Sequence, residues 1–121
     1  MAELISAPTR IPVPGGKVID EHVGRVNSST EALSVAHMVA PANWSEPHQT
    51  PEFDEVTLVL RGTVRVEHGG GLLEVHAGQS VITRAGETVR YSTGDVETEY
   101  VAVCRPAFSP DLAHRDEGTD E

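Results

Sequence analysis

The stretch at residues 44–62, WSEPHQTPEFDEVTLVLRG, decides the fold that we expect for this chain. It begins in a turn-rich segment that carries His48, and it ends in a run of β-branched and aliphatic residues that stops at Gly62. Glu55 starts that run. If two antiparallel strands joined by a bend carry His48 and Glu55, both side chains can point into one cavity. The stretch therefore predicts a β-barrel built around an interior site.

Short β-prone runs separated by turn signals make up much of the rest of the chain. Three consecutive glycines at 69–71 predict a hairpin turn, because glycine adopts positive φ angles without steric cost. No helical window precedes Asp111. Turns spaced this closely predict an all-β fold, an antiparallel sandwich or barrel with little or no helix. The strands that we predict lie at residues 32–40, 55–60, 63–68, 72–76, 80–83, 88–92 and 96–105.

The chain is long enough, at 121 residues, for one domain with a core of its own. The prolines and glycines between residues 8 and 16 exclude a helix there, and Leu4 with Ile5 is our candidate for an edge strand. Such an arm either packs on a neighbouring subunit or is disordered. The organisation that we predict is an extended arm with a first edge strand at residues 1–30, a barrel at 31–108 and a flexible acidic tail at 109–121.

The formal net charge of −10 at pH 7 argues against anionic partners. An acidic surface is repelled by phosphate backbones and by anionic lipids, so we expect neither a nucleic acid nor a membrane as partner. A single cysteine, Cys104, has no disulfide partner within the chain and fits a reducing compartment. No apolar run approaches the roughly 20 residues that span a bilayer, and the first 16 residues do not resemble a signal peptide. We expect a cytoplasmic protein.

The spacing of His48, Thr50, Glu55 and Gly62 resembles the first motif of the cupins, which are small β jelly rolls. That motif has a His, a second His two residues on, a Glu four or five residues later and, after six more residues, a Gly. The chain follows the motif except that Thr50 stands in place of the second His. The resemblance implies an antiparallel jelly-roll barrel around the site.

The second cupin motif is matched by Gly78, by Gly86 and by Val89, which stands where the motif has a His. The likeness covers about residues 33–106. Within the superfamily, the runs FDEVTLVLRGTVRVEHGG, AGQSV and YVAVCRPAF look most like the cupins of the ethanolamine-utilisation protein Q group. That group is also similar in lacking the usual histidine cluster.

The resemblance implies four metal-ligand positions, of which His48 and Glu55 are kept while Thr50 and Val89 fill the other two. Valine cannot bind a metal, and threonine is a poor ligand for a divalent transition metal. Two protein ligands are fewer than the three of a typical catalytic zinc site. We therefore expect no obligatory metal. A divalent transition metal stays possible if His37 joins His48 and Glu55.

Glu55 is the strongest catalytic candidate. An inward carboxylate beside an apolar run is partly desolvated, which raises its pKa and suits it to acid–base chemistry near neutral pH. The alternative is a structural carboxylate. His48 is its candidate acid–base partner, or else a histidine in an exposed loop. Tyr91 shares the side of Val89, whereas Arg90 faces outward, so Tyr91 either donates a hydrogen bond to a substrate or fills the core.

Four further residues are candidates for contact with a small-molecule substrate. Trp44 can instead be a lid or packing residue, and His37 can instead be a core residue beside Val35 and Val39. The four candidates are Thr50, Thr57, Trp44 and His37.

Three functions stay open from the sequence. The first is an acid–base enzyme (isomerase, cyclase, lyase or dehydratase) that acts on a small polar metabolite and needs no metal. The second is a cupin that binds a ligand or a protein partner without catalysis. The third is a metal-dependent enzyme with an unusual ligand set. We also expect a homodimer, because sheet edges need cover and two-fold dimers are the commonest oligomers.

Overall fold

A computed structural model describes residues 1–116, and antiparallel strands dominate it. The one helix among these residues, α1 (Pro110–Ala113), is a single turn capped by the Ser109 side chain. The predicted tail falls partly on residues 117–121, which lie outside the described part of the chain. The strands are β1 (Thr9–Ile11), β2 (Val18–Val23), β3 (Ser34–Ala40), β4 (Asp54–Arg61), β5 (Thr63–His68), β6 (Gly71–His76), β7 (Ser80–Thr83), β8 (Arg90–Thr93) and β9 (Thr98–Arg105).

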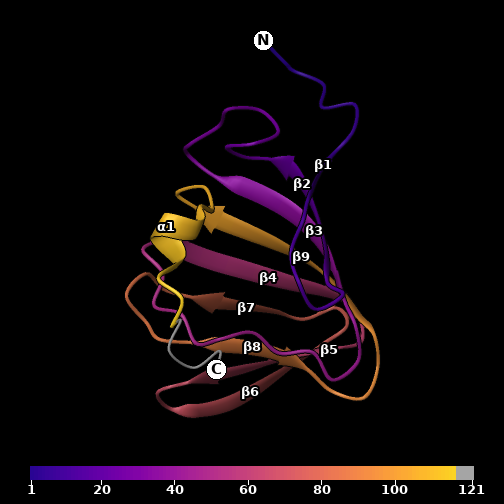
Figure 1. The fold of residues 1–121 in the computed structure, drawn as a ribbon, viewed down its shortest axis with the longest axis vertical. Helices are drawn as coiled ribbons and strands as arrows, with labels where there is room; N and C mark the ends of the chain where they lie inside the picture. Colours follow the sequence, from indigo (N-terminus) through magenta and orange to yellow (C-terminus); the bar gives the residue numbers. More distant parts are fainter. Residues whose placement is uncertain (117–121) are drawn as a thin grey trace.

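The strands form two sheets, one in the order β1-β2-β3-β9-β4-β7 and one in the order β6-β5-β8. Figure 1 shows the larger sheet above the smaller one, with β4 passing from the first to β5 in the second. All strand pairs within the sheets are antiparallel. The prediction of an all-β antiparallel jelly roll with little helix is confirmed.

The first strand was predicted at the wrong place. Leu4 is almost fully exposed, and the arm pairs with the sheet only at β1, where Thr9 lies opposite Glu21. Arg10 donates from Nε to Asp20 Oδ1 at 2.8 Å across this pair. The ion pair and the backbone register fix β1, whereas Leu4 and Ile5 have no strand partner.

Between the two sheets lies a small core made mainly of aliphatic side chains, with two tyrosines. The strands alternate in burial, as a sheet with one wet face requires. On β9, for example, Tyr100 and Ala102 are buried while Val101 and Val103 are not. The buried members of the core are Ala40, Val59, Val64, Val66, Val75, Val89, Tyr91 and Tyr100.

Gly62 makes the turn from one sheet to the other possible. Its φ of +83° is a conformation that other residues rarely adopt. A Cβ at this position would lie 2.4 Å from Thr98 Oγ1 and 2.8 Å from the carbonyl oxygen of Glu97. Gly62 ends the stretch of residues 44–62 that was quoted from the sequence, which we call the organising stretch. A glycine is required at this position by both the backbone angle and the space available.

The segment between β3 and β4 extends the smaller sheet. Ser45 bridges to Ser92 of β8, and Gln49 bridges both to Val89 and to Arg115 near the end of the described chain. Residues 44–50 thus lie along β8, with the segment after α1 on their other side. This brings two regions far apart in sequence to one end of the barrel.

Candidate functional site

Glu55 lies on the inward face of β4. Because side chains alternate along a strand, Glu55, Thr57 and Val59 face the core, while Val56 and Leu58 face outward. Only 9% of Glu55 is exposed. This is the inward orientation that was expected for Glu55 from its place in the cupin motif.

Burial raises the pKa of Glu55 from 4.5 to about 7. The next largest cause is the negative charge of Glu46, which acts in the same direction. The positive charge of Lys17, a hydrogen bond from Tyr91 and the charge of Arg115 oppose the rise. At neutral pH Glu55 therefore populates both its protonated and its ionised form, which a group that exchanges protons needs.

Glu46 is another buried carboxylate, and it pairs with two cations. Its Oε1 lies 3.7 Å from Lys17 Nζ, and its Oε2 lies 3.5 Å from an Arg115 nitrogen. Lys17 also lies over two rings, with Nζ 4.3 Å from the centre of the Trp44 ring and 5.4 Å from that of Tyr100. The resulting cluster of Glu46, Lys17, Arg115 and Glu55 is the mouth cluster.

A small pocket of about 160 Å³ opens beside the mouth cluster. The pocket's polar groups come from Lys17, Glu46 and Arg115. Its other walls come from the arm and from the start of the organising stretch, namely Val13, Pro14, Gly15, Ile19, Trp44, Ser45 and Pro47. A molecule in this pocket would contact an amine, a carboxylate and a guanidinium.

Polar atoms deeper in the barrel have no protein partner. Gln49 Oε1 and Thr57 Oγ1 are buried and accept or donate no hydrogen bond among the described residues. Such atoms are uncommon in folded proteins, and each one is a possible contact for water or a ligand. Thr57, a predicted substrate contact, is thus buried with an unpaired hydroxyl oxygen, and Gln49 was not among the predicted contacts.

Tyr91 faces inward and Arg90 faces outward, as the sequence predicts. The Tyr91 hydroxyl lies 2.8 Å from Thr83 Oγ1. Burial, and then the charge of Glu55, raise the pKa of Tyr91, so its hydroxyl stays protonated and can donate to the Glu55 carboxylate. Tyr91 is thus placed as a hydrogen-bond donor, and it is also part of the core.

The structure does not bring His48 into the barrel. Glu46 and Gln49 take the inward positions of the segment, so His48 faces outward, and its side chain is 44% exposed. Its Nε2 lies 3.9 Å from Glu67 Oε1, beside the pair that Glu67 forms with Arg90. The prediction that His48 points into the cavity with Glu55 is wrong, because the segment is not a regular strand and its side chains do not alternate simply.

His37 also faces away from Glu55. It lies on the outer face of the larger sheet, where its Nε2 is 2.6 Å from Glu99 Oε2. On β3 the inward positions belong to Met38 and Ala40. The alternative prediction, that His37 is a core residue beside Val35 and Val39, is also wrong, because the face that carries these residues is the outer one. Apolar residues occur on both faces of β3.

The three candidate metal ligands lie apart from one another. His37, His48 and Glu55 do not converge, and within residues 1–116 no group of three His, Cys, Asp or Glu side chains could hold a metal ion. Val89 is fully buried in the place where the cupin motif has a histidine. The donor set of this chain therefore does not fit the metal site that the cupin motifs imply.

The remaining candidates lie at the rim. Thr50 Oγ1 is 2.7 Å from Thr88 Oγ1 on the same rim, outside the mouth cluster. Trp44 is half-buried and covers Lys17, so it serves as a wall of the pocket. Cys104 is buried opposite Glu55, and burial raises the pKa of its thiol.

Three members of the mouth cluster were missed by sequence reasoning. Lys17 follows the Pro-Gly-Gly turn of the arm, Glu46 lies inside the organising stretch, and Arg115 lies in the acidic tail. The sequence offers one signal for Lys17, because it is the only lysine in the chain.

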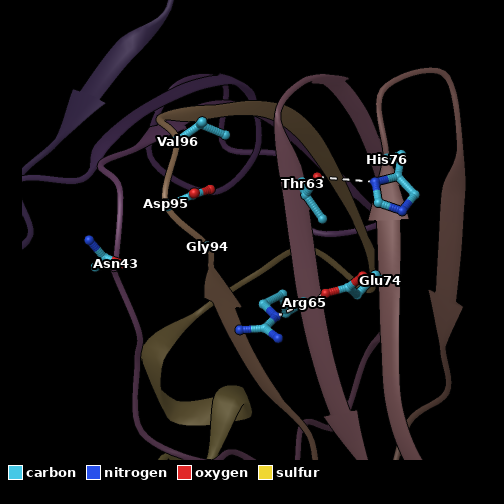
Figure 2. A pocket seen from close by; sticks show the side chains of 8 residues that line it. All are labelled: Asn43, Thr63, Arg65, Glu74, His76, Gly94, Asp95 and Val96. Atoms are coloured by element: carbon cyan, nitrogen blue, oxygen red, sulfur yellow. Dashed lines mark hydrogen bonds and ion pairs between the residues drawn. The ribbon is translucent and has the colours of Figure 1, made fainter.

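A larger groove of about 430 Å³ lies elsewhere, on the outer side of the smaller sheet. Figure 2 shows Arg65 on one strand and Glu74 and His76 on the next, with Asn43 and Asp95 across the groove. None of the predicted site residues lines it, and its side chains are solvent-exposed or half-exposed. We therefore assign the site to the smaller pocket, which is lined by the buried groups Lys17 and Glu46. Glu55 does not line this pocket, but it interacts by charge with both residues.

Comparison with known sequences gives two results. The chain matches the cupin domain family over residues 36–104. It is also 45% identical over 105 residues to a Myxococcus xanthus protein named endoribonuclease YbeY; the matched segment covers 86% of this chain and 36% of that protein. The chain thus spans little more than a third of that relative's length.

Comparison with solved structures places the fold. Ethanolamine-utilisation protein Q from Salmonella typhimurium superposes with a TM-score of 0.65 and 22% identity, over 76% of this chain and 71% of that one. An oxalate decarboxylase from Bacillus subtilis superposes with a TM-score of 0.77 and 17% identity, over 92% of this chain and 31% of that one. Identities this low show a shared fold and not a shared reaction. Among the described residues, no helix is long and apolar enough to cross a membrane.

Proposed function

The chain belongs to the cupin family, and from that premise we propose that it is an acid–base enzyme that acts on a small polar metabolite without an obligatory metal ion. The observation that carries the proposal is Glu55, a buried carboxyl group whose pKa is raised to about 7. A group with this pKa can both accept and donate a proton at neutral pH.

The neighbours of Glu55 supply the other roles. Tyr91 donates a hydrogen bond that stabilises the ionised form, and Glu46 stabilises the protonated form by its charge. Thr57 and Gln49 offer free oxygen atoms for a bound molecule. The cations at the mouth, Lys17 and Arg115, would attract a polar or anionic substrate to the pocket. Isomerisation, cyclisation, elimination of water and lyase reactions all need such a proton exchange.

The test begins with a thermal-shift screen of small metabolites, followed by a turnover assay on each molecule that binds. We expect Glu55→Gln to bind the substrate and to lose turnover by roughly 100-fold or more. Glu67→Gln, a carboxylate on the outer surface, is the matched control and should keep full activity. Equal rates for Glu55→Gln and the unaltered protein would refute the proposal.

The same assay separates the metal-dependent alternative. The proposed enzyme keeps its rate after dialysis against a chelator, and elemental mass spectrometry of the purified protein finds no stoichiometric transition metal. One equivalent of metal per chain, with activity that disappears on its removal, would favour the metal-dependent enzyme instead.

A second candidate function is a module that binds a protein partner without catalysis. It is favoured by the Myxococcus xanthus relative, in which a segment similar to this chain is part of a longer protein named for an endoribonuclease. Binding to the remainder of that protein, purified without its similar segment, would be seen as co-elution at micromolar concentration. Separate elution would count against this function.

We also propose that the chain forms a homodimer. Apolar side chains on the outer face of the larger sheet support this proposal, because Leu58, Leu60 and Ile82 are each more than a third exposed. Exposed apolar groups that lie together mark interaction surfaces. Light scattering at micromolar concentration tests it, and a monomeric mass would refute it.

A further inference from the structure

Lys17 has an unusual position for a lysine. Lysine is among the residues least often buried, because its charge is costly to desolvate. Here the only lysine of the chain has a side chain that is 7% exposed. The turn at Gly15 and Gly16, both with positive φ, delivers it to the mouth of the barrel.

Lys17 is held loosely at its charged end. The ion pair to Glu46 is 3.7 Å long, which exceeds a normal hydrogen bond. The rings of Trp44 and Tyr100 also lie near the amine, with their centres 4.3 Å and 5.4 Å from Nζ. The amine also borders the 160 Å³ pocket, so a small molecule in the pocket would meet it.

The electrostatics around Lys17 favour loss of its proton. Burial lowers the pKa of the amine, and the charge of Arg115 acts in the same direction, whereas Glu46 and Glu55 oppose it. A desolvated lysine of this kind is the usual form of a nucleophilic amine.

We propose that Lys17 is a nucleophile that forms an imine with a small aldehyde or ketone bound in the mouth pocket. This inference goes beyond the acid–base role of Glu55, because it concerns Lys17 and Glu46 and would stand if Glu55 were inert. Reversible capture of a carbonyl compound fits any of the isomerase, lyase or dehydratase reactions above.

The step is balanced by groups in the mouth cluster. Glu46, the carboxylate that faces Nζ, accepts a proton from the Lys17 ammonium, and the neutral amine attacks the carbonyl carbon to form a carbon–nitrogen bond. One of the two protons on the attacking nitrogen passes to the carbonyl oxygen, which becomes the hydroxyl group of a neutral carbinolamine. Glu46 then returns its proton to that hydroxyl, which leaves as water while the nitrogen lone pair forms the double bond. No oxidant or reductant is needed.

The surroundings suit the product as well as the reactant. A protonated imine carries its positive charge on the same nitrogen as the ammonium did, so Glu46 and the face of Trp44 stabilise both. The apolar walls from Val13, Pro14 and Ile19 limit access of water. A cavity of about 150 Å³ can hold a molecule the size of benzene, so carbonyl compounds of that size or smaller fit the pocket of 160 Å³.

The test traps the imine on the intact chain. The protein is incubated with glycolaldehyde or with pyruvate, sodium borohydride is added, and the modified site is found by peptide mass spectrometry. The amino terminus is the other primary amine and serves as an exposed reference. We expect saturable modification of Lys17 by the small carbonyl compounds and none by pyrenecarboxaldehyde, whose fused rings exceed the pocket. An unmodified Lys17 in a sample whose amino terminus is alkylated would overturn the proposal.

Variants distinguish a built site from simple access to reagent. Lys17→Arg keeps the positive charge beside Glu46 and should lose the internal modification completely. Glu46→Gln should lower the initial rate of trapping by roughly 100-fold, because it removes the proton acceptor; an unchanged rate would refute the assigned role of Glu46. Glu55→Gln should still trap, so a failure of the proposed function and a failure of this inference give different results.

Discussion

The raised pKa of Glu55 makes a prediction about stability that needs no substrate. The pKa is 4.5 in the unfolded chain and about 7 in the folded protein. Between those values the folded state binds the proton more tightly than the unfolded state does. Stability therefore falls as the pH rises through this window and levels off above pH 7. Replacing Glu55 by glutamine removes the charge and should remove this loss.

The magnitude follows from the two pKa values. Their separation corresponds to about 3 kcal/mol at pH 8, which is a large part of the stability of a small domain. We expect Glu55→Gln to be more stable than the unaltered protein by up to that amount at pH 8 and nearly equal to it at pH 4.5. The variant would thus gain stability while losing the proposed activity.

Urea unfolding followed by circular dichroism at several pH values between 4.5 and 8 measures this difference. Asp54→Asn is the control on the same strand, and it should behave in the opposite way. A hydrogen bond from the Ala85 amide lowers the pKa of Asp54, so its contribution to stability is present at neutral pH and is lost as the pH falls through the lowered pKa.

Two results would refute the reasoning about Glu55. One is a Glu55→Gln variant that is less stable than the unaltered protein at pH 8, which would mean that the carboxylate is a stabilising structural group. The other is a stability difference that does not change with pH. The second would mean that Glu55 ionises with the same pKa in the folded and the unfolded protein.

Three further predictions concern the fold and the assembly. Val59→Ala should cost about 2 kcal/mol in urea unfolding, because Val59 is fully buried between the sheets, and an unchanged midpoint would contradict the core described here. Gly62→Ala should cost at least as much, since a Cβ would clash with Thr98 and the φ is positive; a neutral effect would contradict the turn geometry. Ile82→Glu should convert the proposed homodimer to a monomer in light scattering, and a persistent dimer would place the interface elsewhere.

The parts of the structure that sequence reasoning predicted well are those covered by the spacing of the cupin motifs. β4 carries apolar residues on both faces, so the inward orientation of Glu55 was expected from its place among the cupin ligand positions and not from alternation. The spacing to Gly62 fixed the end of the strand, and the spacing from Val89 fixed the orientation of Tyr91. Motif spacing assigned these positions, and the period of two along a strand was needed in addition only for Tyr91.

The parts that could not be predicted depend on contacts between distant segments. Lys17 and Arg115 are about a hundred residues apart, and they meet only because both contact Glu46. Residues 44–50 form single bridges and no regular strand, so no period could assign His48 to the outer surface. On β3 apolar residues lie on both faces, which left the side of His37 undetermined by pattern alone.

The composition of the barrel interior is itself an argument for function. Buried ion pairs contribute little to stability, and apolar residues of similar size commonly do as well or better in their place. Val89 shows that this barrel accepts an apolar side chain at an inward position of its site. The interior nevertheless contains two carboxylates and the only lysine of the chain, with Glu55 held at a cost to folding. Buried ionisable groups that lie at or beside a pocket are expected where a protein binds or transforms a molecule. The mouth cluster is thus the part of this chain where we expect a molecule to be bound or transformed.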